Sequence, residues 1–276
     1  MSIVFGLSGP SCSGKTTVAL NLLKLFPRTV IIHQDDFYKP NSQIPVNEAL
    51  GLEDWDCPAS FDMDMIVEEI RVLRKRLCNM AVDDSTDDLT TIRSNFASQW
   101  ANPPDDVDKV IDADVLESLK TKILRTLQIE SLDKTPFSLV LVDGILLFHD
   151  SKPNTTNINA EFDAGLFLYA QYDTLKQRRE ARSGYATKEG IWTDPPGYFD
   201  SIVWPNFIKY HKRFIHEHPQ VLGNGINIVN VGADGYTVES PQNACHIAVC
   251  SSEMPVAGTL QVAVQMLLDS WAGKNS

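Results

Sequence analysis

Residues 9–16 read Gly9-Pro10-Ser11-Cys12-Ser13-Gly14-Lys15-Thr16 and fit the pattern G-x-x-x-x-G-K-[ST] at every fixed position. In this pattern the glycines let the backbone turn so that successive N–H groups point into one concavity and bind phosphate. An apolar run at 3–8 precedes it, and helical spacing follows from 15 to 26. These are the strand and helix that the motif requires, so we predict a phosphate-binding loop; the alternative is a glycine-rich turn.

The loop predicts an ATP site, and the type of each residue in it suits a particular contact. Lys15 is expected to reach the β- and γ-phosphates, and the Thr16 hydroxyl is expected to bind Mg²⁺. Thr17 is placed for a further phosphate contact. The loop residues predicted to bind ATP are Gly9, Pro10, Ser11, Cys12, Ser13, Gly14, Lys15, Thr16 and Thr17.

The rest of the chain alternates between short apolar runs and segments of helical spacing. Runs at 30–33, 139–142, 166–169 and 226–229 suit strands buried on both faces, and 61–77 has helical spacing. A last helix is expected near 260–267, packed on the sheet. This order predicts an α/β fold of the P-loop NTPase type, a parallel sheet flanked by helices, in one domain over 1–276.

An insertion interrupts this order at about 79–135. Its first half is acidic and polar, which indicates a loop. Its second half carries apolar residues at a spacing that predicts one or two amphipathic helices: Val107, Val110, Ile111, Leu116, Leu119, Ile123 and Leu127. The insertion is either a solvated elaboration or a partner surface.

Composition narrows the classes of partner and compartment. The 276 residues carry a net charge of -12, which disfavours a large nucleic-acid surface. No apolar run is long enough to cross a bilayer. The 5 cysteines lack zinc spacing, and the first residues read as a strand rather than a signal peptide. We expect a monomer in the cytoplasm, with the nucleus as the alternative location.

Acidic residues follow two of the expected strands. Asp35 and Asp36 come after the run at 30–33, and Asp143 follows the run at 139–142. An alcohol acceptor needs a base, so we predict Asp35 in that role. Asp143 matches the position of a Walker-B carboxylate, and with Thr16 and Asp35 it completes the predicted Mg²⁺ site. The alternatives are a turn cap for the first pair and a turn residue for Asp143.

A basic cluster indicates a lid at about 173–200. It consists of Lys176, Arg178, Arg179 and Arg182, and Gly184 and Pro195-Pro196-Gly197 bracket the loop that follows. One guanidinium group can bind two phosphate oxygens at once, and its charge offsets the negative charge that develops during phosphoryl transfer. The alternative is a solvated helix face.

Together these motifs resemble the nicotinamide riboside kinases, within the uridine-kinase-like branch of P-loop kinases. The resemblance spans most of the chain in order. Its matching pieces are Gly6-Leu7-Ser8-Gly9, Ser13-Gly14-Lys15-Thr16-Thr17, Gln34-Asp35-Asp36-Phe37-Tyr38-Lys39-Pro40, Trp55-Asp56, Asp143-Gly144-Ile145-Leu146-Leu147-Phe148, the arginine run, Asp194-Pro195-Pro196-Gly197-Tyr198-Phe199-Asp200 and Val203-Trp204-Pro205.

The resemblance implies a role for each matched position. Asp35 would be the proton acceptor, and it would lie at Mg²⁺ with Thr16. The residues that would line the riboside site are Asp36, Phe37, Tyr38, Trp55 and Asp56. Arg178 would contact ATP and take part in catalysis with Lys15, Arg179 would face the riboside, and Arg182 the phosphates. Asp194 would approach the base, and residues 234–237 match an adenine-contacting loop.

Two departures from the family pattern stand out. The family often has Glu where this chain has Asp143, whose shorter side chain favours a metal contact through water. The lid is longer, so the place of Tyr185 relative to the family's lid tyrosine is open.

The implied activity is ATP-dependent phosphorylation of the 5′-hydroxyl of nicotinamide riboside, and of nicotinic acid riboside, in NAD biosynthesis. The side chains suit a pyridinium cation, because Tyr38 and Trp55 offer π faces and Asp36, Asp56 and Asp194 offer negative charge. The alternatives are a uridine/cytidine or other small-metabolite kinase, and a non-catalytic regulatory protein that binds nucleotide.

Overall fold

The structure is a computed structural model of the chain. It describes residues 1–79, 111–149, 158–181, 185–187, 190–215, 226–231, 245–251 and 253–275. Arg182, the loop at 234–237 and the polar half of the insertion lie outside the described residues, and so does the side chain of Tyr185.

One sheet organises the part of the chain that the structure describes. Its strands run in the order β2 (Thr29–His33), β5 (Ser138–Gly144), β1 (Ser2–Ser8), β6 (Ala164–Tyr169), β10 (Cys245–Ser251) and β9 (Ile226–Val231). Every neighbouring pair is parallel except β10 and β9, which are antiparallel. The predicted α/β fold with a parallel sheet is thus confirmed, with an antiparallel strand at one edge.

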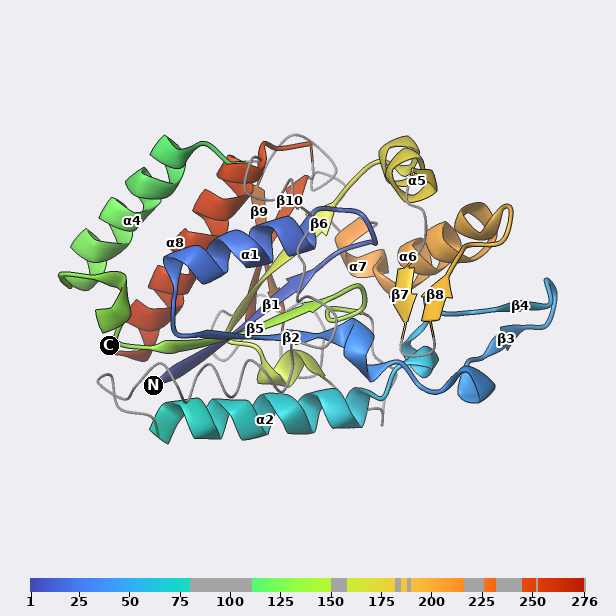
Figure 1. Cartoon of the computed structure of the whole chain (residues 1–276), viewed down its shortest axis with the longest axis horizontal. Coiled ribbons are helices and arrows are strands. Elements are labelled where there is room, and N and C mark those ends of the chain that lie inside the picture. The colour runs from blue at the N-terminus through green and yellow to red at the C-terminus, as the bar shows by residue number, and fades with distance from the viewer. Residues whose placement is uncertain are drawn as a thin grey trace.

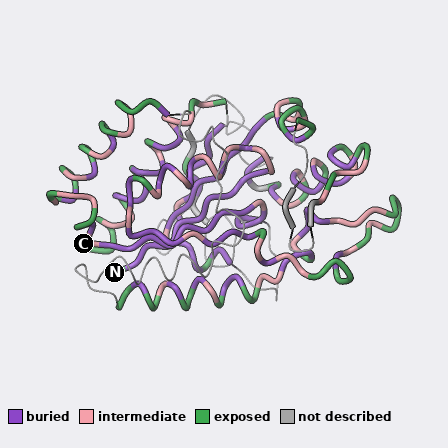
Figure 2. Tube along the Cα trace, in the orientation of Figure 1, coloured by how far each residue is buried: buried purple, intermediate pink, exposed green. Residues whose placement is uncertain are grey.

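Helices cover both faces of this sheet (Figure 1). On one face lie α1 (Lys15–Leu25), α4 (Ala113–Leu127) and α8 (Val256–Lys274), and on the other α2 (Met63–Asn79) and α7 (Lys212–Ile215). Alternate residues of β1 serve the two cores, since Phe5 packs toward α1 and Val4 toward α2. The strands β1, β5 and β6 are buried along their whole length in Figure 2, whereas the outer faces of α2 and α4 are exposed.

The helices expected from periodicity are confirmed as α1, α2, α4 and α8, while Val107 and Val110 of the predicted insertion helices lie outside the described residues. In α4 the Asp112 side chain caps the first turn by accepting from the N–H of Asp114. In α2 the buried stripe includes Ile66 and Ile70, whereas the neighbouring Met65 is 59% exposed. One residue of offset along a helix turns a side chain by about 100°, which moves Met65 off the buried stripe.

Several short elements gather beyond the carboxyl ends of the strands. They are η1 (Gln34–Phe37), η2 (Asn41–Gln43), β3 (Val46–Asn47), β4 (Leu52–Glu53), η3 (Pro58–Ser60), α5 (Tyr172–Glu180), β7 (Tyr185–Thr187), β8 (Gly190–Trp192), the π-helix η7 (Phe199–Val203) and α6 (Trp204–Tyr210). Two further 3₁₀ turns, η5 (Leu132–Lys134) and η6 (Ile158–Glu161), precede β5 and β6. None of the helices that the structure describes is long and apolar enough to cross a membrane.

Candidate active site

Four candidate segments follow the carboxyl ends of four adjacent parallel strands. The loop at 9–14 follows β1, η1 follows β2, the turn at Gly144 ends β5, and α5 follows β6. Parallel strands bring their carboxyl ends to one edge of the sheet, where α/β proteins bind their ligands. Segments more than 160 residues apart in sequence therefore meet at one edge.

The backbone of the phosphate loop is shaped by two glycines. Gly9 has φ +148°, and a Cβ there would lie 2.4 Å from the carbonyl oxygen of Leu168. Gly14 has φ +95° and forms the N-cap of α1, so the helix begins at Lys15. The loop thus presses against β6 and delivers its N–H groups to the positive end of α1, which suits phosphate binding.

Two cations reach this loop from different elements. Lys15 is buried and its Nζ donates to the carbonyl oxygens of Gly9 and Pro10, each at 3.0 Å. Arg178 on α5 donates from Nη1 to the carbonyl oxygen of Cys12 at 3.3 Å. The structure therefore brings together Lys15 and Arg178, two residues predicted to contact ATP, although their roles stay predictions.

The carboxylates after β2 and β5 lie close to one another. His33 and Asp143 are opposite in the β2–β5 register, and His33 Nδ1 lies 3.5 Å from Asp143 Oδ2. The Asp35 residue is exposed by its accessible surface, yet the surrounding protein displaces part of the water that would hydrate its carboxylate. This dehydration and then the charge of Asp143 raise the pKa of Asp35, while Lys15 and His33 oppose the shift. Asp35 and Asp143 therefore repel each other when both are ionised.

This arrangement fits a magnesium ion. Among the described residues, no group of three or more His, Cys, Asp or Glu side chains could hold a metal by itself. Mg²⁺ does not require one, because it is usually bound by one or two carboxylates with waters and phosphate oxygens. Asp143 Oδ1 is buried without a hydrogen-bond partner in the described structure, and a cation would satisfy it. The predicted ligands Thr16, Asp35 and Asp143 are compatible with the ion.

An aromatic cluster forms the other side of the candidate site. The Tyr38 ring stacks on Phe61 at a centroid distance of 4.2 Å and meets the edge of Trp55 at 5.4 Å. The Trp192 ring lies 5.5 Å from Trp55, which is only 8% exposed. Trp192 ends β8 and was missed by the sequence analysis, although an aromatic residue two positions before Asp194 was a usable signal.

A buried ion-pair chain runs beside these rings. Arg179 donates to Asp194 twice, from Nε at 2.5 Å and from Nη2 at 3.0 Å, and its Nη1 lies 3.8 Å from Asp56 Oδ1. Trp192 Nε1 also donates to Asp194 at 3.0 Å. Burial, opposed by Arg179, raises the pKa of Asp56 to about 6. Asp194, which was expected to approach the base, therefore accepts hydrogen bonds from Arg179 and Trp192 and holds both side chains in place.

The remaining predicted residues differ in their surroundings. Asp36 is half-buried next to Asp35, and the Phe37 side chain packs in the core beneath η1. The backbone oxygen of Phe37 accepts from the N–H of Asp62 at 2.9 Å, which ties η1 to the start of α2. The substrate roles of Asp36 and Phe37 stay predictions.

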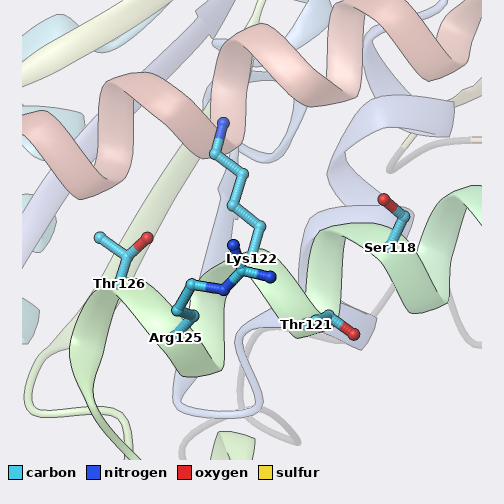
Figure 3. A pocket seen from close by; sticks show the side chains of 5 residues that line it. All are labelled: Ser118, Thr121, Lys122, Arg125 and Thr126. Carbon is cyan, nitrogen blue, oxygen red and sulfur yellow. The ribbon is translucent and has the colours of Figure 1, made fainter.

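A cavity of about 410 Å³ lies elsewhere, on the helix α4 (Figure 3). The described residues that line it all come from this helix and all are exposed: Ser118, Thr121, Lys122, Arg125 and Thr126. In Figure 1, α4 and the lid elements lie at opposite ends of the molecule, so this cavity is separate from the candidate site.

Comparison with curated proteins identifies relatives along the whole chain. The chain is 34% identical to the nicotinamide riboside kinase of Schizosaccharomyces pombe, over 98% of this chain and 97% of that protein. It is 34% identical to the nicotinamide riboside kinase of Saccharomyces cerevisiae, over 76% of this chain and 78% of that protein. With human nicotinamide riboside kinase 1 it shares 29% identity, over 77% of this chain and 78% of that protein.

Two further comparisons add no argument. No family model matches the chain. A solved sugar kinase from Janibacter sp. HTCC2649 aligns over 97% of this chain and 95% of that chain, with 12% identity and a TM-score of 0.38, which is too low to bear on fold or function. The whole-length similarity to the Schizosaccharomyces pombe protein nevertheless shows that this chain belongs to the nicotinamide riboside kinase family.

Proposed function

We propose that this chain transfers the γ-phosphoryl group of ATP to the 5′-hydroxyl of nicotinamide riboside, and of nicotinic acid riboside, in NAD biosynthesis. Membership of the family supports the reaction. Within the molecule, the strongest support is that Asp35, Asp143 and Lys15 lie at or after the carboxyl ends of three adjacent parallel strands, β2, β5 and β1. This placement combines a base, a metal ligand and a phosphate-binding cation at one edge of the sheet.

Asp35 acts as the base in this proposal. Its carboxylate accepts the proton of the 5′-hydroxyl as the oxygen attacks the γ-phosphorus in line with the leaving ADP. Lys15 and Arg178 offset the charge that develops on the transferred group. Thr16, Asp35 and Asp143 would hold Mg²⁺, which supplies positive charge at the phosphate oxygens.

The ion-pair chain and the aromatic cluster supply substrate recognition. Asp56 is buried, and its carboxylate accepts hydrogen bonds from the ribose hydroxyls while Arg179 offsets its charge. Tyr38 and Trp55 present ring faces to the cationic pyridinium. A free base lacks the ribose hydroxyls and would leave Asp56 unsatisfied, so the site discriminates in favour of ribosides.

A coupled assay of ADP release tests the proposal. The protein is supplied with ATP, MgCl₂ and one acceptor at a time: nicotinamide riboside, nicotinic acid riboside, uridine or cytidine. We expect turnover with the first two well above the ATPase background. Turnover with uridine or cytidine alone would replace the proposal by a pyrimidine nucleoside kinase.

Further parts of the proposal concern the whole protein. We propose one kinase domain over 1–276 and a monomer that acts in the cytoplasm. Size-exclusion chromatography with light scattering tests the monomer. Tagging and microscopy test the location.

A further inference from the structure

We infer that Gln34 is a positioning residue, one that holds Asp35 and Asp143 at the separation a divalent cation needs. Gln34 belongs to the matched run at 34–40 but has no role of its own in the proposed reaction. The inference rests on the proposed function, because it concerns the metal ligands of that reaction. It follows from three observations at the junction of β2, η1 and β5.

The first observation is a buried hydrogen bond across the sheet edge. Gln34 is fully buried, and its Oε1 accepts from the backbone N–H of Leu146 at 3.0 Å. Gln34 is the first residue of η1 and directly precedes Asp35, whereas Leu146 lies three residues after Asp143. The Gln34 amide therefore connects the segment that carries one acid to the turn that follows the other.

The second observation is a close approach to Gly144. A Cβ at Gly144 would lie 2.5 Å from Gln34 Oε1 and 2.7 Å from Gln34 Cβ, so no side chain fits at 144 while Gln34 keeps its place. Gly144 directly follows Asp143 in β5. Gln34 thus packs on the backbone next to Asp143, which fixes the spacing between the two acid-bearing segments.

The third observation is that the two acids need such a restraint. The β2–β5 ladder ends at the pair His33–Asp143, so the strand register does not extend to Asp35. Two carboxylates that share one cation carry like charges and repel each other. The hydrogen bond and the packing of Gln34 oppose this repulsion before a cation arrives. Outer residues that orient metal ligands in this way typically contribute about 10- to 100-fold in metal affinity.

Two substitutions at Gln34 separate its hydrogen bond from its volume. Gln34→Met keeps a long side chain and removes the acceptor for Leu146 N–H, whereas Gln34→Glu keeps an acceptor at that place. Gly144→Ala is an independent variant, because its methyl group would displace Gln34 without changing it. Gln43→Ala, an exposed glutamine in η2, is the matched control.

The measurement is binding of Mn²⁺ to the ADP-bound protein, followed by electron paramagnetic resonance without riboside. We expect Gln34→Met and Gly144→Ala to weaken Mn²⁺ binding by about 10- to 100-fold. Gln34→Glu should recover most of the affinity, and Gln43→Ala should match the wild type. Metal-free ADP affinity should be unchanged in all four variants, because the phosphate loop is intact.

Two results would overturn the inference: wild-type Mn²⁺ affinity in Gln34→Met, or an equal loss in Gln34→Met and Gln34→Glu. Should either Gln34 variant not fold, Gly144→Ala against Gln43→Ala decides by the same criterion. Failure of the proposed function is distinguishable, because it would appear as absent turnover of nicotinamide riboside by the wild type, whereas Mn²⁺ binding needs no riboside.

Discussion

The carboxylates at the two ends of the parallel strands differ in how fully they are paired within the chain. At the amino end, Asp163 accepts from Val4 N–H at 2.8 Å and from Arg74 Nη2 at 3.0 Å, and Lys274 Nζ lies 2.8 Å away. At the carboxyl end, Asp143 Oδ1 has no partner in the described structure, and Asp35 faces the like charge of Asp143.

This difference indicates that the amino end of the strands stabilises the fold and that the carboxyl end binds ligands. The pairing at the amino end ties the first strand to the last helix, where the two chain ends lie in Figure 1. It therefore contributes to stability and needs no ligand. The unsatisfied groups at the carboxyl end cost stability in the isolated chain, and a bound nucleotide and cation would satisfy them. Substitutions at the two ends should accordingly affect different quantities.

The largest effect is expected from Asp35→Asn. It removes the base while keeping the shape of the side chain, so kcat should fall by about 10²- to 10⁴-fold. ATP affinity by calorimetry should stay near that of the wild type, and the coupled ADP assay measures turnover. Turnover within threefold of the wild type would show that another group accepts the proton.

The opposite pattern is expected from Asp163→Ala at the amino end. It leaves Val4 N–H without its acceptor and removes the partner of Arg74, so the free energy of unfolding should fall by about 2–3 kcal/mol. Urea denaturation measures this change, and kcat should be unaffected. Asp133→Ala, an exposed aspartate in η5, serves as the control with little change. An equal loss in both variants would contradict the structural role of Asp163.

Asp56→Asn should stabilise the protein at pH 7. The pKa of Asp56 in the folded state is about 6, above the ordinary value of 3.8, so the folded state holds its proton more tightly. Stability contributed by the protonated group is present below about pH 4 and is lost as the pH rises through 6. Asn keeps the neutral shape, so we expect a gain of about 3 kcal/mol at pH 7.

Denaturation of wild type and Asp56→Asn between pH 4 and pH 8 checks this expectation. The gain should shrink as the pH approaches 4, because Asp56 is then neutral in both states. The same variant should turn over nicotinamide riboside more slowly, since an amide accepts the ribose hydroxyls less strongly. A loss of stability at pH 7 would mean that the ionised carboxylate is stabilised by its neighbours.

The smallest of these effects is expected from Asp194→Asn. The change removes one of the two hydrogen bonds from Arg179 and takes the charge from the other, so KM for nicotinamide riboside should rise by about tenfold with a smaller change in kcat. Asp200→Asn is the matched control, because Asp200 pairs with Lys176 on an exposed face of the same lid. An equal rise of KM in the control would indicate a general effect of the lid.

The fold was predictable from local sequence wherever a segment carries its own signal. The runs that became β1, β2, β5, β6 and β9 are mostly apolar, and the loop at 9–16 has a fixed pattern. No strand was predicted at β10, since its pairing with β6 and β9 is not visible in sequence. The hairpin β3–β4 has strands of 2 residues each, too short to give any periodicity.

The candidate site was predictable residue by residue, but its internal contacts were not. Asp35, Lys15 and Asp143 stand in recognisable motifs. The bond from Leu146 to Gln34 joins residues 112 positions apart, and no local pattern indicates it. The same holds for Arg179, whose two acidic neighbours come from separate loops. Contacts of this kind depend on how the strands bring distant segments together.

The central claim is that Asp35 lies where it can accept the proton of a riboside hydroxyl. A crystal structure with Mg²⁺, a non-hydrolysable ATP analogue and nicotinamide riboside tests it most directly. We expect the riboside 5′-oxygen within about 2.6–3.2 Å of an Asp35 carboxylate oxygen and facing the γ-phosphate. A riboside bound elsewhere, or an Asp35 carboxylate turned away from the 5′-oxygen, would contradict the account.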